Sequence, residues 1–236
     1  LLDEALWNID WMLTMQDLDG GVYHKLTTAG FSGFVMPAED KATRYVVQKG
    51  TAATLDFAAV MAMTSRIFRK YPTQRPGFAD SCLNAALRAW NWAQANPAIA
   101  YDQSKLTNPE ITTGTYGDGT FSDEKLWAAV ELTLATRRDS FWVSVFPTGK
   151  FTGGKTVPGW PSVGALGLMS AFGSIDSLIG LVDTTGMQSI LKTLASEATS
   201  RKATSPYGIP VKAGDLYWGS TAVTGNVCLG ALHWYG

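Results

Sequence analysis

The segment from Thr112 to Leu132, TTGTYGDGTFSDEKLWAAVEL, joins a glycine-rich loop directly to a helix-forming run. Its glycines tolerate backbone angles that other residues resist, so the loop can turn tightly. Ser122 is expected to cap the helix that follows. Asp123 and Glu124 then fall in the first helical turn, where the helix dipole favours negative charge. The chain is therefore constrained to place a well-defined helix behind an acid-bearing loop.

Aromatic residues bracket these two carboxylates. Tyr116 and Phe121 precede them and Trp127 follows. Flat apolar faces beside fixed oxygen atoms suit a sugar ring, and carboxylate oxygens also suit a hard cation. An ordinary loop in front of a well-capped helix is an equally good interpretation of these residues alone.

The length and composition are those of one globular unit. With 236 residues and 46% hydrophobic content, residues 1–236 are expected to form a single domain or the central portion of a larger one. The formal net charge is −1 and no long basic block occurs, so neither nucleic acid nor a membrane is an expected partner. The abrupt helical start of the sequence suggests a piece of a longer polypeptide. Cys82 and Cys228 lie in apolar helical patterns and are expected to be buried free thiols.

Hydrophobic periodicity predicts a chain made almost entirely of helices. Long glycine- and aromatic-containing loops separate several of them, and the loop over 20–49 has room for short strands. Such a series of helical hairpins predicts an all-α toroid or solenoid, and the absence of a sequence repeat favours the toroid. The expected helices span 2–16, 50–71, 77–96, 122–138, 162–172, 186–200 and 216–234.

Three motifs, in this order along the chain, resemble glycoside hydrolase family 9. They are DEALWNIDWMLTMQDLDGGVYHKLT, ITTGTYGDGTFSDEKLWAAVEL and DLYWGSTAVTGN. The resemblance covers nearly the whole chain and implies an (α/α)6 barrel, here an incomplete part of it. It also implies a secreted, extracellular cellulase or endoglucanase that hydrolyses β-1,4-glucosidic bonds with inversion and needs no organic cofactor.

The two catalytic motifs of that family are not found in this sequence. In the family, the aspartates that supply the catalytic base lie before the matched region, and the glutamate that acts as the catalytic acid lies after it. No catalytic residue is therefore assigned, and the isolated chain is expected to be inactive. The implied partner is a β-glucan or a cello-oligosaccharide, together with the missing parts of the barrel. A non-catalytic carbohydrate-binding or structural helical module is the alternative.

Four residues carry the implied substrate contacts. His24 matches a histidine of the family's cleft. Tyr116, Trp160 and Trp218 fall near the aromatic residues that stack on sugars in the family. These four are the predicted substrate-binding residues.

A calcium site is implied by the same resemblance. Asp123 and Glu124 match a calcium-binding pair, and oxygens of Gly119 and Thr120 would complete the shell. One departure concerns the distal aspartate of that site, because the corresponding positions hold the sequence Pro161-Ser162, and neither residue is a carboxylate.

Overall fold

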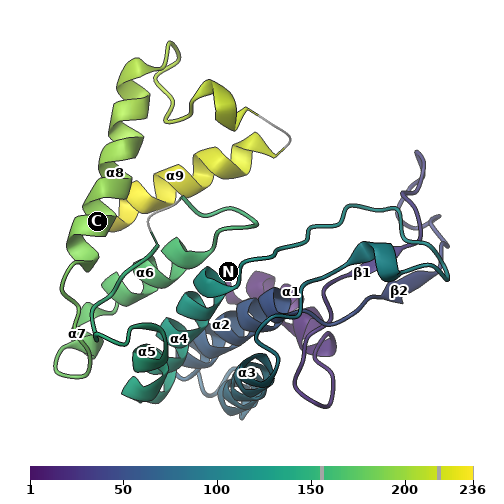
Figure 1. The fold of residues 1–236 in the computed structure, drawn as a ribbon, viewed down its shortest axis with the longest axis horizontal. Coiled ribbons are helices and arrows are strands. Elements are labelled where there is room, and N and C mark those ends of the chain that lie inside the picture. The colour runs from purple at the N-terminus through teal and green to yellow at the C-terminus, as the bar shows by residue number, and fades with distance from the viewer. Residues whose placement is uncertain (155–156, 217–218, 236) are drawn as a thin grey trace.

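A computed structural model describes residues 1–154, 157–216 and 219–235 of the chain. It is built of helices joined by long loops, with one small antiparallel strand pair (Figure 1). The order of elements is α1 Leu2–Thr14, β1 Leu26–Thr28, β2 Arg44–Val46, α2 Thr51–Phe68, α3 Phe78–Ala95, the 3-10 turn η1 Gln103–Lys105, α4 Ser122–Thr136, α5 Asp139–Val145, α6 Gly164–Phe172, α7 Ile175–Leu178, α8 Met187–Thr204, the 3-10 turn η2 Ala213–Asp215 and α9 Ser220–Tyr235.

Helices α2, α3 and α4 form the first core of the molecule. α2 is rich in alanine and packs against both α3 and α4, so its small side chains allow close approach on two sides. Leu55, Phe57 and Met61 of α2 are fully buried there, and Cys82 of α3 joins them. This core explains why the sequence of α2 is apolar on most faces.

Helix α4 also forms one wall of a second core. Trp127 and Leu132 face the first core, whereas Leu126, Val130 and Leu134 face the second. The second core gathers side chains from α5, α6, α7 and α8, to which α9 adds partly buried residues. A helix buried on both sides needs apolar residues all round, which is the pattern of α4.

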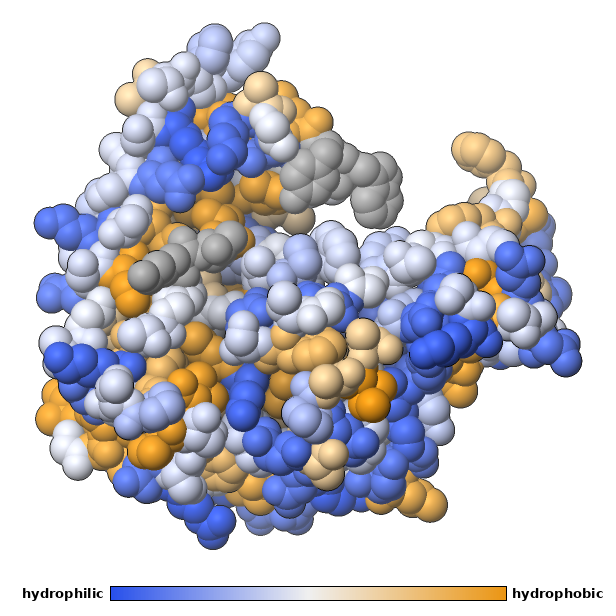
Figure 2. All heavy atoms as spheres, in the orientation of Figure 1, coloured by the Kyte–Doolittle hydropathy of each residue, from blue (hydrophilic) through white to orange (hydrophobic). Residues whose placement is uncertain are grey.

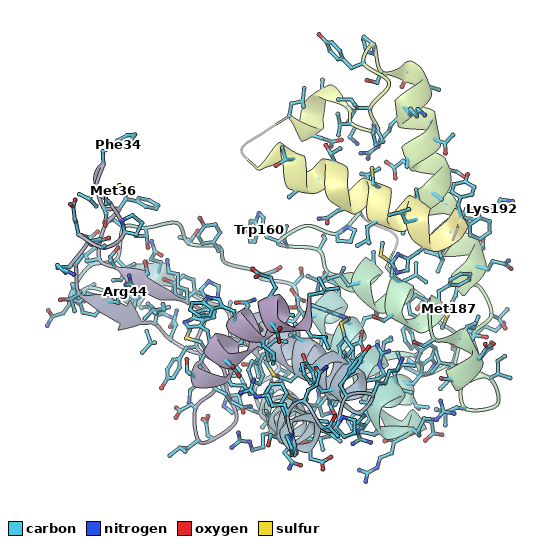
Figure 3. All side chains as sticks on the ribbon, turned by 180° about the vertical axis from the view of Figure 1, so that it is seen from behind. Phe34, Met36, Arg44, Trp160, Met187 and Lys192 are labelled. Atoms are coloured by element: carbon cyan, nitrogen blue, oxygen red, sulfur yellow. The ribbon has the colours of Figure 1, made fainter. Side chains whose placement is uncertain are left out.

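Two parts of the chain extend from these cores (Figure 1). One is the pair α8 and α9, and the other is the arm formed by β1 and β2, in which Leu26 pairs with Val46. Figure 2 shows the molecule hollowed between these two parts. At the tip of the arm Phe34 and Met36 point away from the body and are exposed (Figure 3).

The structure confirms the predicted all-α architecture and the short strands within 20–49. It also contains two short helices, α5 and α7, that periodicity did not reveal because each spans two turns or fewer. Across the described ranges, no helix is both long enough and apolar enough to span a bilayer.

Three local predictions were wrong. Ser122 is the first residue of α4 rather than its cap, because Phe121 holds the N-cap position without a side-chain hydrogen bond. Ser162 does not open α6 either, since Val163 holds that position and the helix begins at Gly164. Cys228 of α9 is exposed, while Cys82 is buried as expected.

One buried ion pair ties α2 to α4. Arg66 Nη2 donates to Glu131 Oε2 at 2.8 Å, and the Glu131 side chain is fully buried. Arg66 also reaches Ser174 Oγ, before α7, at 3.4 Å. Removing one partner of such a pair leaves an uncompensated charge in the interior.

We expect Arg66→Ala to lower the free energy of unfolding by about 3–5 kcal/mol, because it strands the buried Glu131 carboxylate. Urea denaturation followed by circular dichroism measures this change. Arg75→Ala, which breaks the exposed pair with Asp10, is the matched control and should cost less than about 1 kcal/mol. Equal costs for the two variants would contradict this account of the pair.

Candidate functional site

The glycine-rich loop before α4 is anchored to the β1 segment by Lys25. The Lys25 Nζ donates to Gln103 Oε1 at 2.9 Å and to Thr113 Oγ1 at 3.1 Å, and it also donates to the Gly114 carbonyl. The backbone adds a bond from Thr112 N to Ala29 O at 2.7 Å. Sequence analysis missed Lys25, whose only signal was its place beside His24. The loop is thus held by a partly buried cation that has its donors engaged.

The His24 ring contacts this anchored loop and is held in place by it and by Tyr101. Its Nε2 is 2.9 Å from the Thr115 carbonyl oxygen, so this nitrogen carries the proton, and the ring stacks on Tyr101 with centroids 4.0 Å apart. Burial lowers the pKa of His24, the Thr115 bond opposes that shift, and the charge of Lys25 adds to it. The imidazole is therefore neutral at pH 7 and carries one fixed tautomer.

Tyr116 and Trp160 form an exposed aromatic pair beside His24. Their centroids are 6.4 Å apart at 87°, and the side chains are 53% and 61% exposed. Tyr116 has a φ of 49°, a strained value for a non-glycine residue. Gly114 permits this conformation because a Cβ there would lie 2.7 Å from the Tyr116 ring. Figure 3 shows Trp160 projecting from its loop toward the hollow.

The structure therefore brings together three of the four predicted substrate-binding residues. His24 touches the residue before Tyr116, and Tyr116 contacts Trp160. The fourth, Trp218, lies outside the described residues, and its role stays a prediction. Trp127, which the sequence placed beside the carboxylates, is buried in the core instead.

The first turn of α4 carries two carboxylates, Asp123 and Glu124. Asp123 Oδ2 accepts a hydrogen bond from the Val163 N–H at 2.8 Å, which fixes the start of α6 against the start of α4. Gly164 allows the close approach, since a Cβ there would lie 3.2 Å from the Asp123 Cβ. Asp118 Oδ1 accepts from the N–H and the hydroxyl of Thr120. These hydrogen bonds fix the end of the glycine-rich loop where it joins α4.

Four carboxyl groups have a buried oxygen with no hydrogen-bond partner in the part of the chain that the structure describes. One is Glu131, whose Oε1 is the free oxygen of the ion pair with Arg66, and the other three are residues of α2, of α4 and of the loop before α4. The atoms of these three are Asp56 Oδ1, Asp118 Oδ2 and Glu124 Oε2. Burial raises the pKa of Glu124 to about 9, and the nearby charge of Asp123 contributes to that shift. Burial also raises the pKa of Asp56 to about 7, with contributions from Asp123 and Asp118. Both groups therefore hold a proton more readily than exposed acids do.

Sequence analysis did not identify Asp56 as a site residue. Its signal was a single acid inside the Ala-rich, apolar run of α2. Asp56 and His24 line one cavity of about 130 Å3, whose other walls include Trp11, Met15 and Tyr23. Asp56 thus links the aromatic site to the buried carboxyl groups.

The predicted calcium donors, Asp123 and Glu124 with oxygens of Gly119 and Thr120, lie at the start of α4 and in the loop before it. Glu124 Oε2 is a buried oxygen in need of a partner, and carboxylate and carbonyl oxygens are ligands that calcium prefers. The N–H of Val163 occupies one Asp123 oxygen near the place where the family resemblance implied a distal carboxylate. Among the described residues, no three His, Cys, Asp or Glu side chains form a metal-binding group. The oxygen donors are of the type that calcium prefers, but the set lacks the distal carboxylate that the family resemblance implied.

We expect the stability of the chain to fall as pH rises from about 4 to 7, because folded Asp56 keeps a proton that the unfolded chain has released. Asp56→Asn should remove this part of the slope and raise the melting temperature at pH 7. Thermal unfolding at a series of pH values measures both effects.

Asp176→Asn, at an exposed acid of α7, is the control for this experiment and should behave like the unmodified chain. Glu124, whose pKa burial raises to about 9, keeps its own share of the slope in Asp56→Asn. A slope of unchanged size in that variant would show that Asp56 does not carry a buried proton.

Comparison with known proteins identifies the family of this site. Residues 1–236 match the family model described as Glycosyl hydrolase family 9. The chain belongs to glycosyl hydrolase family 9. This result confirms the resemblance inferred from the three motifs.

Curated members of the family include two informative relatives. The chain is 48% identical, over 72% of its length, to the xyloglucan-specific endo-β-1,4-glucanase of Bacteroides ovatus, of which it covers 29%. It is 33% identical, over 96% of its length, to Endoglucanase C of Cellulomonas fimi, of which it covers 21%. The chain thus spans less than a third of the length of these two curated relatives.

Solved structures of the family have the same fold. A GH9 structure of Bacteroides ovatus superposes with a TM-score of 0.83 at 38% identity, covering 100% of this chain and 45% of that one. AaCel9A in complex with a cellobiose-like isofagomine gives 0.82 at 29% identity, covering 96% and 42%. The fold is part of an (α/α)6 barrel, as the resemblance implied.

Proposed function

We propose that this chain supplies one wall of the substrate cleft of an endo-β-1,4-glucanase. The observation that carries the proposal is the exposed Tyr116–Trp160 pair held beside a neutral His24. Aromatic faces pack against the apolar faces of sugar rings, and an uncharged imidazole suits neutral hydroxyl groups. Membership of the family and the endoglucanase names of its relatives support a cellulose-type or xyloglucan-type β-glucan as the substrate.

The acid and base of the reaction are proposed to lie outside residues 1–236. Inverting hydrolysis uses two carboxyl groups roughly 6.5–9.5 Å apart, one on each side of the scissile bond. Asp123 is engaged by the Val163 N–H, and Glu124 is buried, so neither is free to contact a sugar. The contribution of this chain is to bind and orient the glucan. A non-catalytic carbohydrate-binding module remains the second candidate, because it would need only the aromatic pair.

We expect Tyr116→Ala and Trp160→Ala each to weaken cellotetraose binding about tenfold, because each removes an aromatic face from the pair. Isothermal titration calorimetry on the 236-residue chain measures the affinity. Tyr207→Ala, at an exposed tyrosine of the loop after α8, is the matched control and should leave it unchanged. Loss of affinity in Tyr207→Ala alone would place the glucan elsewhere.

We further propose that calcium binds at Asp123 and Glu124 with oxygens of Gly119 and Thr120. The support is the unpartnered Glu124 Oε2 together with the oxygen-rich donor set. A bound cation would displace the proton that Glu124 holds, so the affinity should rise with pH.

Calcium at about 100 times its Kd should raise the free energy of unfolding by about 2.7 kcal/mol and the melting temperature by several degrees. Differential scanning fluorimetry with calcium, and then with a chelator, measures the shift. Glu124→Gln should abolish it. A melting temperature that neither addition moves would rule out this site.

The protein is proposed to act outside the cell, because β-glucan polymers are extracellular substrates. Immunodetection in the culture medium against the cell fraction tests this location. The remaining parts of the barrel are proposed as the partner that covers apolar residues of α1 such as Trp7, which is exposed.

A further inference from the structure

A second cavity has Thr115, the residue before Tyr116, in its wall and is not used by the function proposed above. It has a volume of about 480 Å3 and lies between η1 and the loop that leads to Tyr116. Small-molecule sites commonly enclose roughly 300–1,000 Å3, so this cavity is large enough for a single sugar. Its apolar surface comes from Leu106 and from Ile111, which is buried.

Three polar side chains of the cavity wall are free to bind a ligand. The hydroxyls of Thr107 and Thr115 and the carboxylate of Glu110 make no hydrogen bond to any other described residue. A carboxylate accepts hydrogen bonds through two oxygens, and each threonine hydroxyl both donates and accepts. Together they match the vicinal hydroxyl groups of a pyranose ring, with the two aliphatic side chains beside its C–H groups.

The charge of the cavity favours a neutral ligand. Glu110 is the one ionisable residue on its described wall, and it is acidic. The nearby Lys25 ammonium already donates to Gln103, Thr113 and the Gly114 carbonyl, so it has no N–H left to donate to an anionic group. An acidic sugar would be repelled, whereas an uncharged one would not.

Thr115 connects this cavity to the proposed glucan-binding wall. Thr115 belongs to the cavity wall, its carbonyl oxygen accepts a hydrogen bond from His24 Nε2–H, and the next residue is Tyr116. A glucan lying along Tyr116 would therefore pass the mouth of the cavity. We infer that the cavity binds a neutral sugar branch of a substituted β-1,4-glucan. This inference rests on the proposed function.

The experiment compares two ligands that share one backbone. Cellotetraose and its xylose-branched xyloglucan counterpart are titrated into the 236-residue chain by calorimetry. The branched ligand should bind more tightly to the unmodified chain. Glu110→Gln should weaken its binding about tenfold, because it removes a charged acceptor, and Thr107→Val should weaken it a few-fold.

The control variant is Glu39→Gln, which makes the same chemical change at an exposed glutamate on the β1–β2 arm. It should leave both affinities unchanged, and Glu110→Gln should leave cellotetraose binding within about twofold. Equal affinity for the two ligands, or equal losses for both in Glu110→Gln, would overturn the branch site while leaving the glucan wall intact. Binding of neither ligand would overturn the proposed function and the branch site with it.

Discussion

Helix α4 is buried from both sides, and this packing organises the molecule. Leu132 belongs to the core built with α2 and α3, and Val130 belongs to the core built with α6 and α8. Because α4 is shared, the loop in front of it is fixed relative to both halves of the molecule. The bond from Val163 N to Asp123 Oδ2 then sets the loop of Trp160 against the loop of Tyr116. A packing constraint thus places the two aromatic rings.

The binding wall is held in place by polar groups that do not themselves face the hollow. Lys25 ties Thr113 and Gly114 of the loop to Gln103 of η1, and the Thr115 carbonyl fixes the tautomer of His24. The positive φ of Tyr116 is a cost that the surrounding anchors have to offset. Such preorganisation reduces the entropy lost when a flexible glucan binds.

Much of this fold could be predicted from the sequence, because long amphipathic and Ala-rich segments have a clear helical period. The grouping of His24, Tyr116 and Trp160 followed from the family motifs rather than from periodicity. The raised pKa of Asp56 could not be predicted, since it depends on burial in the fold and on the nearby charges of Asp123 and Asp118. The starts of α4 and α6 were misplaced for a similar reason. The serines there resemble caps, but the hydrogen bond that joins the two helix starts is donated by the Val163 N–H and accepted by Asp123.

The central claim is that residues 1–236 bind a β-glucan while the catalytic acid and base lie elsewhere. Reducing-sugar release from carboxymethyl cellulose by the purified 236-residue chain, checked by intact mass, tests that claim most directly. We expect no release from a chain that still binds cellotetraose. Turnover that Asp123→Ala or Glu124→Ala abolishes without unfolding the chain would contradict it, because the catalytic carboxylates would then lie in α4.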